Sequence, residues 1–186
     1  GYRAEALHGG LSQEQRDRVM KKIIASYPRS IMTCRGEPFF TLARAIVGQQ
    51  ISVKAAQSVW GKLMLAYPEF TAEKMARARV TRMRACGLSE RKAEYIRDLA
   101  SHLTKGKIEP STWSMRHDDE IIKDLIQVKG IGRWTAEMFL MFNLLRGDIL
   151  PLGDIGLLNA IHLHYNDSEP MALDDIAALA ENWRPW

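Results

Sequence analysis

Apolar side chains recur every three or four residues along almost the whole chain, a spacing that leaves little room for any fold other than a helical one. A repeat of about 3.6 residues places such side chains on one face of a helix. Alternating runs of Val, Ile, Thr and aromatic residues between hairpin turns, which predict strands, are absent. We therefore predict an all-α fold, and the 186 residues suffice for one domain with a substantial core.

Capping residues and prolines give approximate boundaries for the predicted helices. The helices are expected from Ser12 to before Pro28, from Pro38 to near Gly48, from Ser52 to Tyr67, from Thr71 to about Arg79, from Ser89 to about Leu103, from Asp118 or Asp119 to Ile126, from Arg133 to before Gly147, from Asp154 onward, and from Leu173 to Trp183. In the helix after Asp154, we expect Ile155, Leu158 and Ile161 to face inward.

The cysteines and histidines do not form the patterns of a metal site. Cys34 and Cys86 are too few for a disulfide framework or for a four-cysteine metal or iron–sulfur site, so we expect both thiols to be reduced. His162 and His164 diverge on their predicted helix, and His117 is isolated. We therefore expect no metal bound by side chains.

The net charge and the targeting signals constrain the function less than the motifs do. The formal charge of +4 and the pI near 9.1 are compatible with a polyanionic partner but do not establish one. No apolar run reaches the length of about 20 residues that crosses a bilayer, and residues 1–10 lack the features of a secretory signal. We expect an intracellular protein, cytoplasmic or at the nucleoid in a bacterium and nuclear in a eukaryote. The scattered basic residues Lys54, Arg91, Lys92 and Arg97 are expected on solvated helix faces.

The segment VKGIGRWT contains two glycines directly before a predicted helix. Free N–H groups at Gly130, Gly132 and the helix start would form an anion site that suits one phosphate group. Thr135 could add a hydroxyl, and Lys129 and Arg133 would bring positive charge to the same face. The alternative is that the two glycines only close a tight helical hairpin.

Four segments of the chain carry a resemblance to a known family. LIQVKGIGRWTA resembles the helix-hairpin-helix of the DNA glycosylase superfamily, and PLGDIGL resembles that superfamily's loop ending in a catalytic aspartate. FTLARAIVGQQISVKAA and ENWRPW resemble segments of the 3-methyladenine DNA glycosylase II family. The resemblance covers most of residues 38–186. It implies a two-lobed helix-hairpin-helix DNA glycosylase fold with a cleft between the lobes, as one domain over residues 1–186, with the hairpin at about 118–145 and the catalytic loop at 146–154.

The resemblance also implies an activity. The protein is expected to flip an alkylated purine out of double-stranded DNA and to hydrolyse its N-glycosidic bond, leaving an abasic site. The base would be 3-methyladenine, with 7-methylguanine as a further candidate. Asp154 matches the catalytic aspartate, although an aspartate before an apolar run is also a common helix cap. The two roles are compatible, because the N–H groups of Gly156 and Leu157 would favour the ionised carboxylate that an oxocarbenium-like sugar requires.

The residue before the small-residue start of the second hairpin helix decides the type of chemistry. Relatives that also nick the backbone carry a nucleophilic lysine there, and this chain has Trp134. An indole cannot form a Schiff base, so the resemblance implies a monofunctional enzyme. Trp134 and Met138 match a base pocket, and Trp183 is expected to form another wall near Asp154. Core packing is the alternative for all three side chains.

The expected break between two helices near Gly48 matches the place where the family inserts a side chain into the duplex. Gln50 is the candidate wedge, with Gln49 alongside, and a solvated turn is the alternative. We expect no cofactor for catalysis. The resemblance implies a Na+ or K+ ion on the backbone carbonyls of Val128 and Ile131 when DNA is bound.

Double-stranded DNA with damaged bases is the expected partner, bound by a monomer that contacts no membrane. Two other functions stay open at this point. One is a non-enzymatic helix-hairpin-helix module that grips DNA for a larger assembly. The other is a glycosylase for oxidised or mismatched bases.

Overall fold

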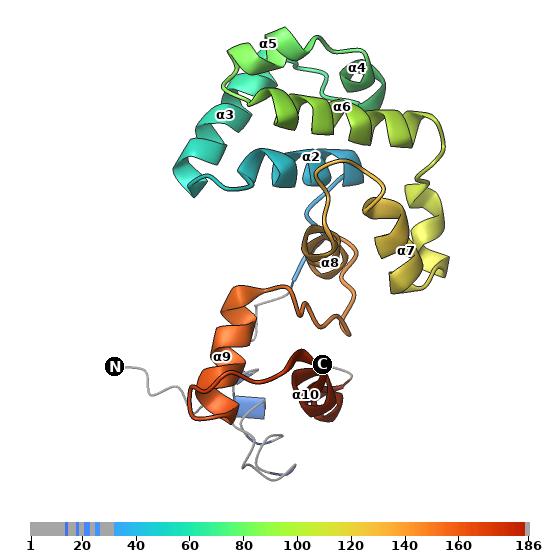
Figure 1. Ribbon diagram of the computed structural model, residues 1–186. Helices are drawn as coiled ribbons and strands as arrows, with labels where there is room; N and C mark the ends of the chain where they lie inside the picture. Colours follow the sequence, from blue (N-terminus) through green and yellow to red (C-terminus); the bar gives the residue numbers. More distant parts are fainter. Residues whose placement is uncertain (1–13, 15–17, 19–20, 23–24, 27–31, 185–186) are drawn as a thin grey trace. The chain divides into compact units, whose positions relative to one another are not determined.

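The computed structural model describes residues 14, 18, 21–22, 25–26 and 32–184, and this part is helical and without strands. The prediction of an all-α fold is therefore confirmed (Figure 1). The chain divides into two compact units. One contains Gly1–Thr33 together with Gly147–Trp186, and the other contains Cys34–Arg146. The predicted helix between Ser12 and Pro28 lies mostly outside the described residues.

The larger unit holds α2 (Pro38–Gly48), α3 (Val53–Ala66), α4 (Ala72–Ala76), α5 (Val80–Ala85), α6 (Glu90–Thr104), the 3-10 helix η1 (Pro110–Met115), α7 (Asp118–Leu125) and α8 (Arg133–Phe142). The other unit holds α9 (Ile155–Tyr165), α10 (Leu173–Ala180) and the 3-10 helix η2 (Glu181–Trp183).

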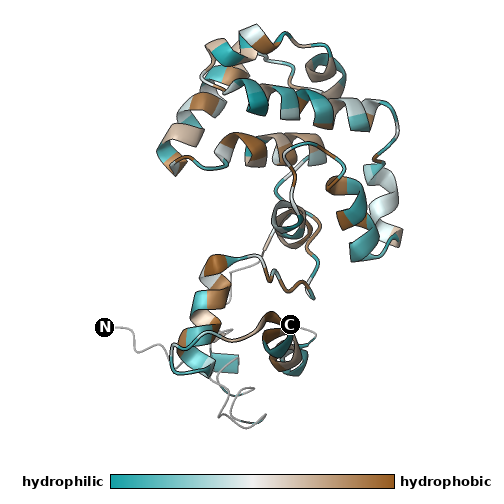
Figure 2. Ribbon diagram, viewed as in Figure 1, coloured by the Kyte–Doolittle hydropathy of each residue, from teal (hydrophilic) through white to brown (hydrophobic). Residues whose placement is uncertain are grey.

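Helix α6 is the centre of the larger unit, because α2, α4 and α5 all pack against it. Its apolar face is fully buried through Ala93, Ile96 and Leu99. Figure 2 shows brown apolar and teal polar residues sharing single helices, as expected for amphipathic helices with one face in a core. This packing fixes the turn between α2 and α3 on α6, and α8, which follows the turn after α7, contacts α2.

Several predicted helix starts are confirmed by their capping hydrogen bonds. The Ser52 hydroxyl accepts from the Ala55 N–H at 3.2 Å, and the Ser89 hydroxyl accepts from the Lys92 N–H at 3.3 Å. Thr71 caps α4 in the same way. These residues end a connection and begin a helix because their side chains satisfy donors that the first turn leaves unpaired.

Other boundaries differ from the predictions. The helix expected from Thr71 to Arg79 is interrupted, with α4 ending at Ala76 and α5 beginning at Val80. The N-cap of α7 is His117 and neither aspartate, and the carboxylate of Glu120 accepts from the His117 N–H at 3.1 Å. Helix α8 ends at Phe142 with Asn143 as its C-cap, and Leu145, at φ +57°, has left the helical conformation. The side chain of buried Asn143 donates to the Gly36 carbonyl at 2.9 Å.

Two predictions about individual side chains are wrong. Ile155 was expected inward but is 74% exposed, while Ile161 is buried as predicted. Lys92 was expected on a solvated face but is half-buried and hydrogen-bonded. Both errors arise because helical spacing gives a face of the helix and not the neighbours that cover it.

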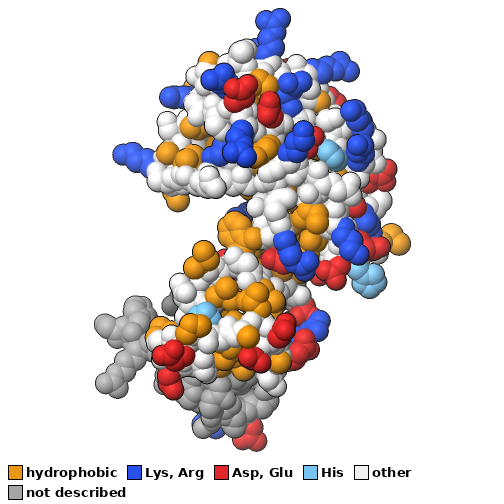
Figure 3. All heavy atoms as spheres, viewed as in Figure 1, with side chains coloured by type: hydrophobic (Ala, Val, Ile, Leu, Met, Phe, Trp, Pro, Cys, Tyr) orange, Lys and Arg blue, Asp and Glu red, His pale blue; other side chains and the backbone are white. Residues whose placement is uncertain are grey.

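Within the described residues, Cys34 and Cys86 are free thiols, and no three potential ligands among His, Cys, Asp and Glu form a metal-binding group. No helix of this part combines the length and apolar character of a membrane span. In the view of Figure 3, lysine and arginine side chains gather over the part of the larger unit formed by α3 to α6.

Candidate functional site

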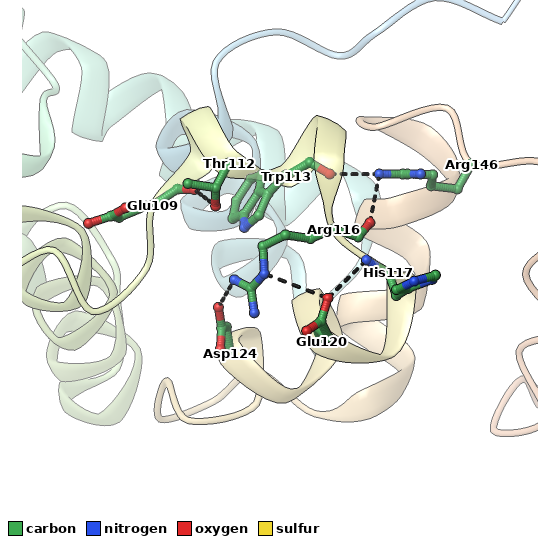
Figure 4. Close-up of polar contacts among 8 residues, drawn as sticks. All are labelled: Glu109, Thr112, Trp113, Arg116, His117, Glu120, Asp124 and Arg146. Carbon is green, nitrogen blue, oxygen red and sulfur yellow. Dashed lines mark hydrogen bonds and ion pairs between the residues drawn. The ribbon is translucent and has the colours of Figure 1, made fainter.

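The first helix of the hairpin, α7, is anchored by a polar network (Figure 4). The Arg116 guanidinium forms an ion pair with Asp124 and lies 4.0 Å from Glu120. Arg146 donates to the Trp113 carbonyl at 2.7 Å and to the Arg116 carbonyl at 3.3 Å. The Asp124 hydrogen bond raises the pKa of Arg116 further, so its charge is permanent. The network ties both ends of the hairpin region to η1.

The two glycines of the turn serve different purposes. Gly130 has φ +84°, and a Cβ there would lie 2.1 Å from Cδ2 of Tyr95, so both the backbone and the packing require glycine. Gly132 is the N-cap of α8 and makes no side-chain capping bond. A Cβ on Gly132 would meet nothing within 4 Å. The start of α8 is therefore an open helix N-terminus, as an anion site requires.

The charged residues of the hairpin are not equivalent. Lys129 is exposed, and its backbone N–H donates to Asp98 Oδ2 at 2.8 Å. The Arg133 side chain instead pairs with Glu137 at 2.8 Å and with Asp119 at 3.6 Å. Lys129 is thus the hairpin side chain better placed to add positive charge at the surface, and Arg133 offers its backbone N–H in the first turn of α8.

The predicted break near Gly48 is confirmed, and its two glutamines differ in environment. Gln49 Nε2 donates to the Gly130 carbonyl at 2.8 Å. Gln50 is exposed and has φ +57°, a left-handed conformation that is rare for a residue with a side chain. The structure gives Gln49 an internal partner and leaves Gln50 at the surface of the turn.

A hollow of about 830 Å³ opens in the larger unit between α2, the start of α3 and α8. Five predicted site residues line it, namely Gln49, Gln50, Trp134, Thr135 and Met138. Its walls are aromatic and apolar, and they include Phe40, Phe139 and Phe142. Trp134 is 45% exposed, so a planar ligand could reach its ring from solvent.

Sequence patterns missed several residues of this hollow. Residues 49–52, between α2 and α3, form what we call the wedge turn. Ile51 lies in this turn and Val53 follows it, and both are exposed despite being apolar. Arg35 and Arg44 bring positive charge to the wall, and the Arg35 guanidinium lies 4.3 Å from the centre of the Phe142 ring. The sequence offered one signal for Ile51 and Val53, namely apolar residues directly after the two glutamines. The place of Arg35 depends on chain folding and has no local signature.

Asp154 lies in the other unit, at the N-terminus of α9. Its carboxylate accepts from the Leu157 N–H at 3.0 Å, which confirms the predicted cap. A tight turn precedes it, in which the Asp154 N–H donates to the Pro151 carbonyl at 2.9 Å. The side chain is partly exposed. A carboxylate held this way at a helix N-terminus is favoured in its ionised form.

Trp183 packs against Tyr165, with ring centres 5.5 Å apart. Tyr165 is the last residue of α9, whereas Asp154 caps its first turn. The described contacts therefore give Trp183 a packing partner at the opposite end of α9 from Asp154.

A glycine turn before an open helix N-terminus is the geometry of a helix-hairpin-helix motif and suits a phosphate of a DNA backbone. The comparisons with known proteins agree with this motif. The model of the HhH-GPD superfamily of base excision DNA repair proteins matches residues 43–185, and the chain belongs to this superfamily.

Within this superfamily, the chain is similar to proteins named for 3-methyladenine. A Schizosaccharomyces pombe protein named DNA-3-methyladenine glycosylase 1 is 32% identical over 87% of this chain and 72% of its own length. The crystal structure of a DNA-3-methyladenine glycosidase from Bacillus halodurans matches with a TM-score of 0.79 and 31% identity, over 90% of this chain and 82% of that one. The Schizosaccharomyces pombe 3-methyladenine DNA glycosylase bound to abasic DNA matches with a TM-score of 0.73 and 29% identity, over 95% of this chain and 87% of that one.

The lengths of the relatives differ. The chain spans only about half the length of some curated relatives that it matches, 53% for one from Bacillus subtilis.

Proposed function

We propose that this chain is a monofunctional DNA glycosylase that removes alkylated purines, 3-methyladenine and also 7-methylguanine, and leaves an abasic site. One observation carries the proposal. A single family match, over residues 43–185, contains both the glycine hairpin and the Asp154 loop in the expected order. These relatives are named for 3-methyladenine, and the structure of one of them is a complex with abasic DNA.

In this proposal Asp154 supplies the negative charge that stabilises the sugar cation in the transition state, or it activates the attacking water. The Leu157 N–H keeps the carboxylate oriented. An N-alkylated purine already carries positive charge as a leaving group, so little protonation by an acid is needed. One carboxylate then suffices where many glycosidases use two.

The flipped base would enter the hollow beside Trp134 and Met138. A cationic purine gains from stacking on an electron-rich indole face. Trp134 cannot form a Schiff base, and the hairpin lysine, Lys129, lies in the turn at the surface. We assign Lys129 to phosphate binding, so the enzyme would use water and leave the backbone intact.

The hairpin would grip the strand through the N–H groups at Gly132 and the start of α8. A Na+ or K+ ion on the carbonyls of Val128 and Ile131 would add a positive charge facing the phosphate. Carbonyl oxygens of a tight turn suit such an ion, and the Val128 carbonyl already accepts from the Ile131 N–H at 3.1 Å within this turn. The enzyme would act as a monomer in the compartment that holds the genome.

The test is an incubation of the protein with methylated duplex DNA, followed by chromatography of the released bases. We expect free 3-methyladenine, with strand breaks only after alkali treatment. Breaks before alkali would contradict the monofunctional assignment. Tight DNA binding without base release would favour the non-enzymatic module, and release of oxidised bases alone would favour a different glycosylase. Binding to any duplex should weaken as salt rises, because the grip is on phosphates.

A further inference from the structure

One face of α6 contacts both turns that the proposed function assigns to DNA. Lys92, Tyr95 and Asp98 follow at intervals of three residues, which places them on adjacent turns of the helix. Lys92 reaches the turn between α2 and α3. Tyr95 and Asp98 reach the turn between α7 and α8.

Lys92 holds the end of α2. Its Nζ donates to the Val47 carbonyl at 2.9 Å and to the Gln49 carbonyl at 2.6 Å. The last carbonyls of a helix have no partner within the helix and carry its negative pole, so an ammonium group both pairs with them and neutralises them. Burial lowers the pKa of Lys92, as expected for a side chain recruited inward from the helix surface.

The same contacts continue to the hairpin. The Gln49 carbonyl accepts from Lys92, and the Gln49 side-chain amide donates to the Gly130 carbonyl at 2.8 Å. Gly130 in turn lies against the ring of Tyr95, and the N–H of the preceding residue, Lys129, donates to Asp98. The two turns are thus joined directly through Gln49 and indirectly through α6.

We propose that Lys92 is a positioning residue that makes the wedge turn and the hairpin turn one rigid DNA-binding surface, with Gln49 as the link and Gln50 as the inserted side chain. The inference rests on the proposed function. When the hairpin binds the DNA backbone, a wedge turn that is rigidly joined to the hairpin inserts its side chain into the duplex, because the wedge turn cannot shift away from the DNA. A loosened turn would still bind DNA but would stabilise the flipped state less.

The test compares Lys92→Met with Arg91→Met. Both variants remove one positive charge from α6, and Arg91 is an exposed neighbour to which we assign no role. With enzyme in excess on methylated DNA, Lys92→Met should lower the single-turnover excision rate about tenfold, and Arg91→Met should stay within about twofold. Affinity for undamaged duplex should be equal in the two variants. Equal excision rates in all three proteins would overturn the inference.

A second variant covers the case in which Lys92→Met does not fold. Gln49→Met removes only the amide link to Gly130 and leaves the α2 carbonyls paired with Lys92. Gln49→Met should lower the excision rate by a factor similar to that of Lys92→Met. The double variant should excise no more slowly than the slower of the two single variants, because the two substitutions break the same chain of contacts. Multiplicative losses in the double variant would contradict the link.

Binding also separates this inference from the proposed function. If the wild-type protein released no base, the proposed function would be wrong. Its affinity for a duplex with a tetrahydrofuran abasic-site analogue could still be compared with its affinity for an undamaged duplex, and the ratio of the two affinities is its preference. The inference predicts that Lys92→Met lowers this preference about tenfold and that Arg91→Met keeps it. An unchanged preference in a folded Lys92→Met protein would be evidence against a positioning role.

Discussion

Residues 34–146 and residues 147–186 carry charge of opposite sign. The first region has 19 lysine and arginine residues against 12 aspartate and glutamate residues, whereas the second has one arginine and seven acidic residues. The first region contains the hairpin, the wedge turn and the hollow, and the second contains Asp154. A net charge of +4 for the whole chain hides this separation.

The opposite charges of the two regions indicate that one serves DNA binding and the other serves the chemistry. A basic region attracts the phosphate backbone at any sequence and supplies affinity. An acidic region cannot contribute to that grip, and a carboxylate held there at a helix start is suited to stabilising a developing positive charge. Affinity and chemistry should therefore respond to different substitutions.

The largest effect is expected for Asp154→Asn. Asparagine caps a helix about as well as aspartate, so the fold should be kept. The loss of the negative charge should lower the excision rate about 100-fold or more, while affinity for DNA stays the same or rises, because a charge that repels phosphate is gone. Single-turnover excision and fluorescence anisotropy measure the two quantities.

Asp154→Glu is the matched control, since it keeps the charge and moves it by one methylene. It should retain more activity than the asparagine variant. If Asp154→Asn excised bases at a near-normal rate, the assigned role of Asp154 would be wrong, and the acidic region would have no part in the chemistry.

The second prediction concerns the glycines of the basic region. Gly130→Ala places a Cβ against Tyr95 in a left-handed backbone, so it should lower the free energy of unfolding by about 2 kcal/mol or more. Gly132→Ala meets open space and should change stability by less than about 1 kcal/mol. It should nevertheless weaken DNA binding, because its methyl group would occupy the place proposed for a phosphate. Urea unfolding and anisotropy separate the two outcomes.

Local patterns predicted much of the fold and part of the site. The caps Ser52, Ser89 and Asp154 were found from sequence because a cap depends only on residues within one turn. The hairpin between α7 and α8 was found in the same way, from two glycines before a helical repeat.

Contacts between distant segments were not predictable. Lys92 looked like a solvated basic residue because its partners, Val47 and Gln49, are more than 40 residues away in the chain. Gln49 was expected alongside the Gln50 wedge, and its bond to Gly130 could not be predicted from the sequence. Such contacts depend on how the helices pack, which a helical repeat does not encode.

The third prediction tests whether the hollow of the basic region selects the base. Trp134→Ala should lower excision of 3-methyladenine about tenfold, since one stacking face is lost. General DNA affinity should change much less, because the ring takes no part in the phosphate grip. Trp134→Phe keeps an aromatic face and should recover part of the loss. Equal losses of excision and of affinity would favour a packing role for Trp134.

The smallest effect is expected from the titration of Lys92 within the basic region. Burial lowers its pKa in the folded protein from the ordinary value of 10.5, so the unfolded chain binds more protons than the folded one between the two pKa values. Raising the pH through this window therefore favours the folded state. The stability of the wild type relative to Lys92→Met should rise slightly as the pH is raised toward the ordinary lysine pKa of 10.5, whereas its stability relative to Arg91→Met should not follow this trend. Urea unfolding at several pH values measures both differences, and a falling difference for Lys92→Met would mean that the ammonium group gains more from the α2 carbonyls than it loses by burial.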